Sequence, residues 1–503
     1  MKPALVSLDP APQVATAAPT TTWRPAKPAS TTAIDPIALR HELGDFDRFP
    51  VSTLLKEARP DVYQQCVDVM RRAREYTSRH VLPHAVAWDQ EAAANHSFIP
   101  WAAIDAGLPY GFLGMNVPGV LGGSNFGVTA ACVFAEEVAA ADAGVYVIYG
   151  AHALALSLVI ASLDLRAMSM VGREICEGEK RGTATLLALA HTEPTGGSDV
   201  EDVEDIRHAD LGSRFHAVSG GVRVRARKVF ISNGSIARDQ VLTAFEGPRR
   251  PLETMAALLI PNDAPGLSIG RIERKLGQRL SSAAEVICDD VFVPDSHVIR
   301  IDDGARAIDT TLSLTRGPVG AMATGIIRGT LDRTLAYLEQ KRVGGRWLFE
   351  SQWVQLALAD MVAALQASRG LYMDAGTAGD AWGIAKLMNL FPSHLPVSVR
   401  NNPVYAGLLG RPMVADRIRA LYRSQVQGDQ LQRLVAHASI AKFGCSDAAV
   451  RVSMQAMEIL GEDANDPRWG VEKAMRDAKL GQIFEGTNQI NRLHVARGMI
   501  RRA

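Results

Sequence analysis

Neither sign of charge is in excess in this chain of 503 residues, because Lys plus Arg and Asp plus Glu each number 54. Without a basic surplus there is no long-range field to attract nucleic acid or an anionic membrane, and we expect neither as a partner. Cysteine is scarce, and no two cysteines form a C-x-x-C pair, which argues against a zinc site and fits a reducing, cytoplasmic compartment. We therefore expect no metal and five buried, inert thiols: Cys66, Cys132, Cys176, Cys288 and Cys445.

The N-terminus lacks the apolar core of a signal peptide, and Ala, Pro and Thr dominate residues 11–36. This composition predicts a disordered extension over residues 1–49. Long apolar runs are also rare. The one candidate for a membrane span, residues 143–163, carries no formal charge but contains polar and glycine positions and has no close basic anchors, so a buried core helix is the favoured interpretation.

A chain of this length predicts two or three packed units with a cleft between them. Residues 50–185 show helical periodicity, whereas residues 186–302 contain short β-type runs and a hairpin turn at Ser219-Gly-Gly-Val. Residues 303–503 return to helical patterns, and an atypical insertion is expected at about 374–433. The predicted fold is α+β: an N-terminal helical domain, a central β-sheet or barrel domain, and a C-terminal helical bundle. The C-terminal helices are predicted at 316–338, 352–371, 436–460 and 488–500.

No Walker A loop and no G-x-G-x-x-G fingerprint is present, which disfavours a Rossmann enzyme. Four other motifs occur in order. They are His191-Thr-Glu-Pro-Thr-Gly-Gly-Ser-Asp199, Lys228-Val-Phe-Ile-Ser-Asn-Gly234, Lys275-Leu-Gly-Gln-Arg with Asp290-Val-Phe-Val-Pro294, and Met475-Arg-Asp-Ala-Lys-Leu-Gly-Gln-Ile-Phe-Glu-Gly-Thr-Asn-Gln-Ile-Asn-Arg492. Together they resemble the signatures of the acyl-CoA dehydrogenase family, over about residues 50–371 and 436–497.

The resemblance implies FAD, and the residue types suit it. Adjacent glycines let backbone N–H groups approach a flat ring, and hydroxyls can bind its edge. Phe230 and Ser232 are same-face neighbours on a strand, so one can cover the flavin while the other donates toward N5. Taken alone, the first segment is more typical of a Gly-Pro turn between a helix and a strand, and Phe230 could equally be an ordinary core phenylalanine. The implied cofactor residues are Thr192, Gly197, Ser198, Phe230, Ser232, Arg342, Gln352, Thr487 and Gln489.

By the same resemblance, Glu485 is the base that removes the α-proton of an acyl thioester. Such a proton is weakly acidic, so its removal needs a positioned base in a dry pocket, a polarised carbonyl and a hydride acceptor. Thr487 is a plausible N-cap for the last helix, which would leave a solvated capping carboxylate as the alternative role of Glu485. Some relatives carry the base before the Arg that corresponds to Arg316, but Thr315 cannot serve. The implied substrate residues are Ser198, Ser313, Arg316 and Gly486, although Arg316 could also be a surface ion-pair member.

Two segments depart from the family pattern. In the family, one helix end lends an Arg and a Gln to the cofactor of a neighbouring subunit. The matching segment here is Lys341-Arg-Val-Gly-Gly345 with Gln352, so Arg342 is shifted by one place. Glu458 and Glu462 place carboxylates where the anionic diphosphate end is normally held, and like charges repel there. The insertion at 374–433 is apolar enough to form a subunit contact or a lid.

The sequence thus predicts FAD-dependent α,β-dehydrogenation of a thioester of coenzyme A or of an acyl-carrier protein. Electrons would leave to an electron-transfer flavoprotein or a similar acceptor, and the protein would be a homodimer or homotetramer. The alternatives are a flavin monooxygenase or oxidase on the same fold, since fold alone does not decide function, and a flavin-free binding protein.

Overall fold

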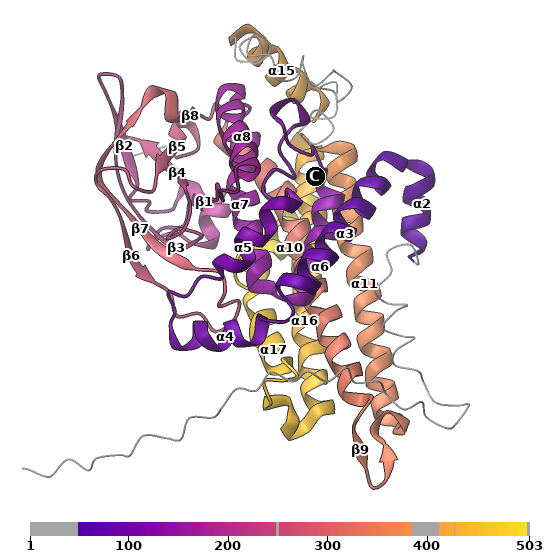
Figure 1. Ribbon diagram of the computed structural model, residues 1–503. Helices are drawn as coiled ribbons and strands as arrows, with labels where there is room; N and C mark the ends of the chain where they lie inside the picture. The colour runs from indigo at the N-terminus through magenta and orange to yellow at the C-terminus, as the bar shows by residue number, and fades with distance from the viewer. Residues whose placement is uncertain (1–48, 248–250, 385–411, 427, 500–503) are drawn as a thin grey trace, which may run out of the picture.

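The computed structural model describes residues 49–247, 251–384, 412–426 and 428–499. The predicted extension 1–49, apart from Phe49, and the middle of the predicted insertion lie outside the described residues. Figure 1 shows three parts: a block of helices from the first third of the chain, a sheet to the left, and long helices from the last third in the centre and at the right.

The first block contains helices whose starts follow from local sequence. Pro50 and Pro60 occupy the first helical positions of α2 and α3, where no amide hydrogen is needed. The carboxylate of Asp142 accepts from Val145 N at 2.9 Å and caps α7. The helices are α2 (Pro50–Ala58), α3 (Pro60–His80), α4 (Ala85–Ala94), α5 (Trp101–Gly107), α6 (Val128–Ala141), α7 (Ala143–Ala161) and α8 (Leu165–Lys180).

Helix α7 is the apolar run that the sequence singled out. Among the described residues it is the one helix long and apolar enough to cross a membrane, and 78% of its most apolar window is buried inside the structure. It packs against α6, α10 and strand β1. This position is that of a core helix, as predicted.

The middle part is an eight-stranded sheet in the order β6-β7-β3-β2-β4-β5-β8, with β1 added in parallel to β4. The predicted hairpin is confirmed: Val218 pairs with Gly221 across a turn at Ser219–Gly220. Its strands are β1 (Leu187–Ala190), β2 (Arg214–Val218), β3 (Gly221–Ser232), β4 (Asp239–Glu246), β5 (Met255–Pro261), β6 (Leu267–Ile272), β7 (Ala283–Pro294) and β8 (Val298–Arg300).

The end of β3 is irregular where the cofactor motif was predicted. The register between β3 and β7 shifts between Lys228 and Ile231, and Phe230 has a φ of 57°, which a residue with a side chain rarely adopts. The bulge leaves the Phe230 side chain 60% exposed.

The last third forms a helical bundle around α10. That helix packs on α6, α7, α11 and α16, and it is central in Figure 1. Its elements are α10 (Gly304–Leu338), the hairpin β9 (Arg342–Val343) and β10 (Arg346–Trp347), α11 (Gln352–Trp382), α15 (Pro412–Gln425), α16 (Gly428–Leu460), α17 (Val471–Leu480) and α18 (Asn488–Met499). The short helix α9 (Pro251–Thr254) belongs to the middle part, between β4 and β5.

Three of these helices are longer than predicted. Helix α10 begins at Gly304 rather than at Arg316, because Asp303 caps it by accepting from Arg306 N at 3.0 Å. Most of α10 is buried, so no polar face marks where it starts. Helix α11 runs on to Trp382, and α16 starts at Gly428.

The order of helical, sheet and helical parts confirms the predicted fold class. The division at 185/186 and 302/303 stays a prediction. All five cysteines are free and buried, and burial raises the pKa of the Cys176 and Cys445 thiols to about 12. The prediction that all five thiols are buried is therefore confirmed, and their inertness stays a prediction.

Candidate active site

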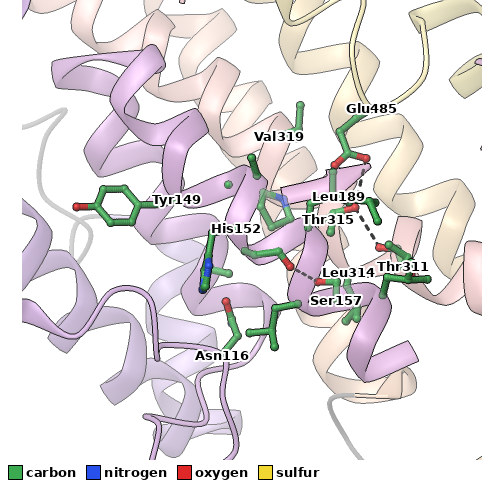
Figure 2. Close-up of a pocket in the computed structure, with 18 of the residues that line it drawn as sticks. Asn116, Tyr149, His152, Ser157, Leu189, Thr311, Leu314, Thr315, Val319 and Glu485 are labelled. Carbon is green, nitrogen blue, oxygen red and sulfur yellow. Dashed lines mark hydrogen bonds between the residues drawn. The ribbon is translucent and has the colours of Figure 1, made fainter. Parts of the chain in front are cut away.

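A cavity of about 240 Å³ lies where α6, α7 and α10 meet the sheet and the segment before α18. Its walls are mostly apolar, with Phe112, Phe134 and Leu156 among them. Two carboxylates, Glu201 and Glu485, also line it. Figure 2 shows Glu485 above the face of α10 that carries Thr315 and Thr311, with α7 across the cavity.

The other ionisable groups at the cavity are held neutral. His152 accepts from Leu187 N through Nδ1 and contacts Leu113 O through Nε2, both at 3.1 Å, and burial lowers its pKa to about 4. Burial likewise lowers the pKa of His191 to about 4. Burial raises the pKa of Tyr146. Among the described residues that line this cavity, the two carboxylates therefore remain as candidates for a general base.

Glu485 stands at the turn between α17 and α18 in a strained backbone conformation. Its φ is 55° and that of Gly486 is 74°, a conformation that costs a residue with a side chain roughly 1–2 kcal/mol and that clusters at functional sites. Thr487 Oγ1 accepts from Ile490 N at 3.4 Å, which confirms its predicted role as N-cap of α18. Glu485 therefore precedes the cap and is not the capping residue itself.

The carboxylate of Glu485 has few stabilising partners. Thr315 Oγ1 lies 3.3 Å from Oε2, but the same hydroxyl is closer, at 3.0 Å, to Thr311 O on its own helix. Burial raises the pKa of Glu485 to about 7, and the neighbouring carboxylate of Glu201 adds to this shift. A carboxyl group with such a pKa is a stronger base than an exposed one at the pH of the cell.

Arg316 is fully buried, which excludes the surface ion-pair interpretation. Its Nε donates to the backbone carbonyl of Glu485 at 3.2 Å, and its Nη2 lies 3.4 Å from Glu201 Oε2. Lys442, also buried, donates to Gly486 O at 2.7 Å. Arg316 and Lys442 therefore hold the two successive carbonyls of Glu485 and Gly486, and neither hydrogen-bonds the Glu485 carboxylate in the described residues.

The residues at the sheet side of the cavity fit a flavin. Phe230, Ser232 and Thr192 all line the cavity. The aromatic side chain is 60% exposed although it is large and apolar, so a flat ring stacked on it would cover it. Within the described residues, the hydroxyls of Ser232 and Thr192 donate to no protein acceptor, so both are available to a polar ring edge.

The structure places the remaining predicted residues elsewhere. Ser198 accepts from Thr487 N at 3.1 Å through Oγ, so it joins the first and last motifs at the edge of the site. Ser313 donates to Thr310 O on its own helix at 2.7 Å and does not line the cavity. The remaining residues, Gly197, Arg342, Gln352 and Gln489, are exposed.

Arg342 and Gln352 were expected to serve a neighbouring subunit's cofactor, and that role stays a prediction. Arg342 stacks on Trp347, with its guanidinium carbon 3.9 Å from the ring centre. The preceding cation, Lys341, binds Asp463 Oδ2 at 2.6 Å. The segment that follows α16 therefore neutralises one cation of this hairpin.

Two residues of the site had no part in the sequence prediction. Glu201 ends the short helix η4 (Ser198–Glu201) and lies two residues after the last residue of the first motif, Asp199, and this closeness was the available signal. Lys442 lies in the middle of α16 with apolar neighbours, where a lysine is rare unless paired.

Comparisons with known proteins support the family resemblance found in the sequence. Residues 65–163, 188–291 and 302–388 with 413–500 match the profiles of acyl-CoA dehydrogenase N-terminal, middle and C-terminal domains, respectively. The chain is 29% identical, over 85% of its length and 96% of the relative, to a cyclohex-1-ene-1-carbonyl-CoA dehydrogenase of Geobacter metallireducens. It is 30% identical to a cyclohexane-1-carbonyl-CoA dehydrogenase of the same organism, over 63% of this chain and 69% of the relative.

Among solved structures, butyryl-CoA dehydrogenase from Megasphaera elsdenii superposes with a TM-score of 0.69 at 23% identity, covering 88% of this chain and 98% of that one. This likeness concerns the fold. Residues 389–412, inside the predicted insertion, are left unmatched by the C-terminal domain profile.

Proposed function

The chain belongs to the acyl-CoA dehydrogenase family of FAD-dependent oxidoreductases, and we propose from the geometry of its cavity that Glu485 is the base of an acyl-thioester α,β-dehydrogenation. The observation that carries the proposal is a carboxylate without a strong hydrogen-bond donor, at the wall of an apolar cavity that Phe230 and Ser232 also line.

The residues of the chain would act as follows. The apolar walls hold the acyl chain and exclude water, which strengthens every electrostatic interaction inside. Arg316 and Lys442 hold the backbone around Glu485, so the carboxylate is aimed before the substrate arrives. Glu485 then takes the α-proton onto a carboxylate oxygen. FAD, when bound against Phe230, supplies the acceptor for the β-hydride.

The role of Glu485 favours desaturation over the monooxygenase alternative, because an enzyme that only activates oxygen has no need of an α-proton base. The acyl group remains open between straight, branched and cyclic chains. The two Geobacter relatives act on cyclic acyl-CoA thioesters by name, so cyclic substrates belong in any test. Proposals that go with this function are an electron-transfer flavoprotein or similar acceptor, a homodimer or homotetramer, and a cytoplasmic location.

The test is anaerobic mixing of the purified protein with straight, branched and cyclic acyl thioesters, each carried on coenzyme A and on a carrier protein. We expect a yellow protein whose flavin is bleached by at least one thioester, together with a product that has lost two hydrogens by mass spectrometry. A protein that binds no FAD, or a bound flavin that no thioester reduces, would contradict the proposal. Adding an electron-transfer flavoprotein or oxygen to the reduced enzyme then identifies the class of acceptor.

A further inference from the structure

A second carboxylate, Glu201, lies in the same cavity as Glu485. It ends η4, two residues after the first motif, and its side chain is 20% exposed and lines the cavity. A buried carboxylate is costly unless it is paired. Its partners therefore indicate what it does.

Glu201 binds the one nitrogen of Arg316 that has no other partner. The guanidinium is fully buried and every nitrogen is engaged: Nε with the Glu485 carbonyl at 3.2 Å, and Nη1 with Ser439 Oγ at 3.0 Å and His494 Nδ1 at 2.5 Å. Nη2 contacts Glu201 at 3.4 Å. No nitrogen of Arg316 hydrogen-bonds the carboxylate of Glu485 in the described residues.

Gly486 brings the two glutamates to one corner. A Cβ atom at Gly486 would lie 2.9 Å from both Glu201 Oε2 and Arg316 Nη2, and the backbone of Gly486 hydrogen-bonds Glu201. Glu485 is the adjacent residue. If Glu201 were absent, Nη2 would be a buried, unpaired donor, and the carboxyl groups that remain to interact with Arg316 would be those of Glu485 and Asp309.

We propose that Glu201 is a positioning residue for proton abstraction: by binding Arg316 it prevents an ion pair between Arg316 and the Glu485 carboxylate and keeps Glu485 a strong base. This inference rests on the proposed function for its catalytic meaning. The arrangement itself follows from the contacts of Arg316 alone.

The charged and titratable groups around Glu485 have opposing effects on its pKa, and this supports the role proposed for Glu201. Burial first, and then Glu201, raises the pKa of Glu485 to about 7, whereas Arg316 and Lys442 lower it. Burial also raises the pKa of Glu201 against the opposing effect of Arg316. The groups that face this cluster come from five elements: Glu201 of η4, Tyr146 of α7, Asp309 and Arg316 of α10, Lys442 of α16 and His494 of α18.

The first experiment compares Glu201→Gln with Glu204→Gln, an exposed glutamate three residues away. Removing a neighbouring like charge and freeing Arg316 should lower the pH midpoint of flavin reduction by about one unit. A weaker base should also reduce the plateau rate about threefold. Glu204→Gln should change neither. Glu201→Asp keeps the charge, so its pH midpoint of flavin reduction should stay close to that of the unmodified protein.

The second experiment follows Glu485 without turnover. Infrared difference spectra of protein labelled with carbon-13 at the glutamate carboxyls, titrated from about pH 5 to about pH 9, report carboxyl ionisation in the resting enzyme. The band that Glu485→Gln removes identifies Glu485. In Glu201→Gln this band should titrate at lower pH than in the unmodified protein.

An unchanged titration of Glu485 in folded Glu201→Gln overturns the inference. If Glu201→Gln does not fold, Glu201→Ala takes its place, because it also removes the carboxylate: a lower titration of Glu485 supports the inference, and an unchanged titration overturns it. Failure of every thioester to reduce the flavin would reject the proposed function, while the infrared titration would still test whether Glu201 controls Glu485.

Discussion

Replacing Gly486 with alanine tests whether the turn that carries Glu485 is held as the structure describes. The new Cβ would lie 2.7 Å from Ile490 Cγ2 and 2.9 Å from both Arg316 Nη2 and Glu201 Oε2. A left-handed backbone at a residue with a side chain costs roughly 1–2 kcal/mol, and overpacking a filled site costs typically about 1–3 kcal/mol. Together these predict a loss of about 2–5 kcal/mol in the free energy of unfolding.

The matched control is Gly220→Ala in the β2–β3 turn. Gly220 has a similar φ of 79° but no atom within 4 Å of an added Cβ, so only the backbone cost of roughly 1–2 kcal/mol applies there. Urea unfolding followed by tryptophan fluorescence measures both variants. We also expect Gly486→Ala, but not Gly220→Ala, to slow flavin reduction, because the turn must shift and move Glu485. Equal destabilisation of the two variants, with unchanged reduction rates, would refute the packing described for this corner.

Three further predictions concern the base, the cofactor and the fold. The rate of flavin reduction should rise with pH through about 7, because the base must be ionised and burial raises the pKa of Glu485 to about 7; a rate independent of pH in this range would count against it. Phe230→Ala should weaken FAD binding about twofold to tenfold by loss of stacking, while Phe292→Ala on β7, exposed outside the cavity, should not, as fluorescence titration of the flavin-free protein would show. Asp380→Asn should lower the free energy of unfolding by about 1–3 kcal/mol, because this carboxylate caps α6 through Val128 N at 2.6 Å, whereas the exposed Asp360→Asn should be neutral in the same urea assay.

Much of the fold could be predicted because its signals are local. Alternation in β3 and the glycine turn before it predicted the hairpin, and the ordered motifs predicted the family. The start of α10 could not be predicted from periodicity, because a helix buried on nearly all sides shows no polar face.

In the candidate site, too, the residues within local motifs could be predicted, and those that depend on distant contacts could not. Glu485, Phe230 and Ser232 stand inside motifs that could be recognised, and the structure brings all three to one cavity. Glu201 could not be predicted as part of the site, because its role depends on a contact with Arg316, 115 positions along the chain. Ser313, which lies near Arg316 in the sequence, was predicted as a substrate residue. Its hydroxyl instead donates to a backbone carbonyl of its own helix, and it does not line the cavity.

The central claim is that Glu485 removes the α-proton, and the most direct measurement is anaerobic stopped-flow flavin reduction by Glu485→Gln. The substitution keeps size and hydrogen-bonding capacity but removes the basic carboxylate, so thioester binding should persist. The rate of bleaching should fall by about 10²–10⁴-fold, the usual contribution of a general base. Bleaching at a rate comparable to that of the unmodified protein would show that another group takes the proton and would contradict the account.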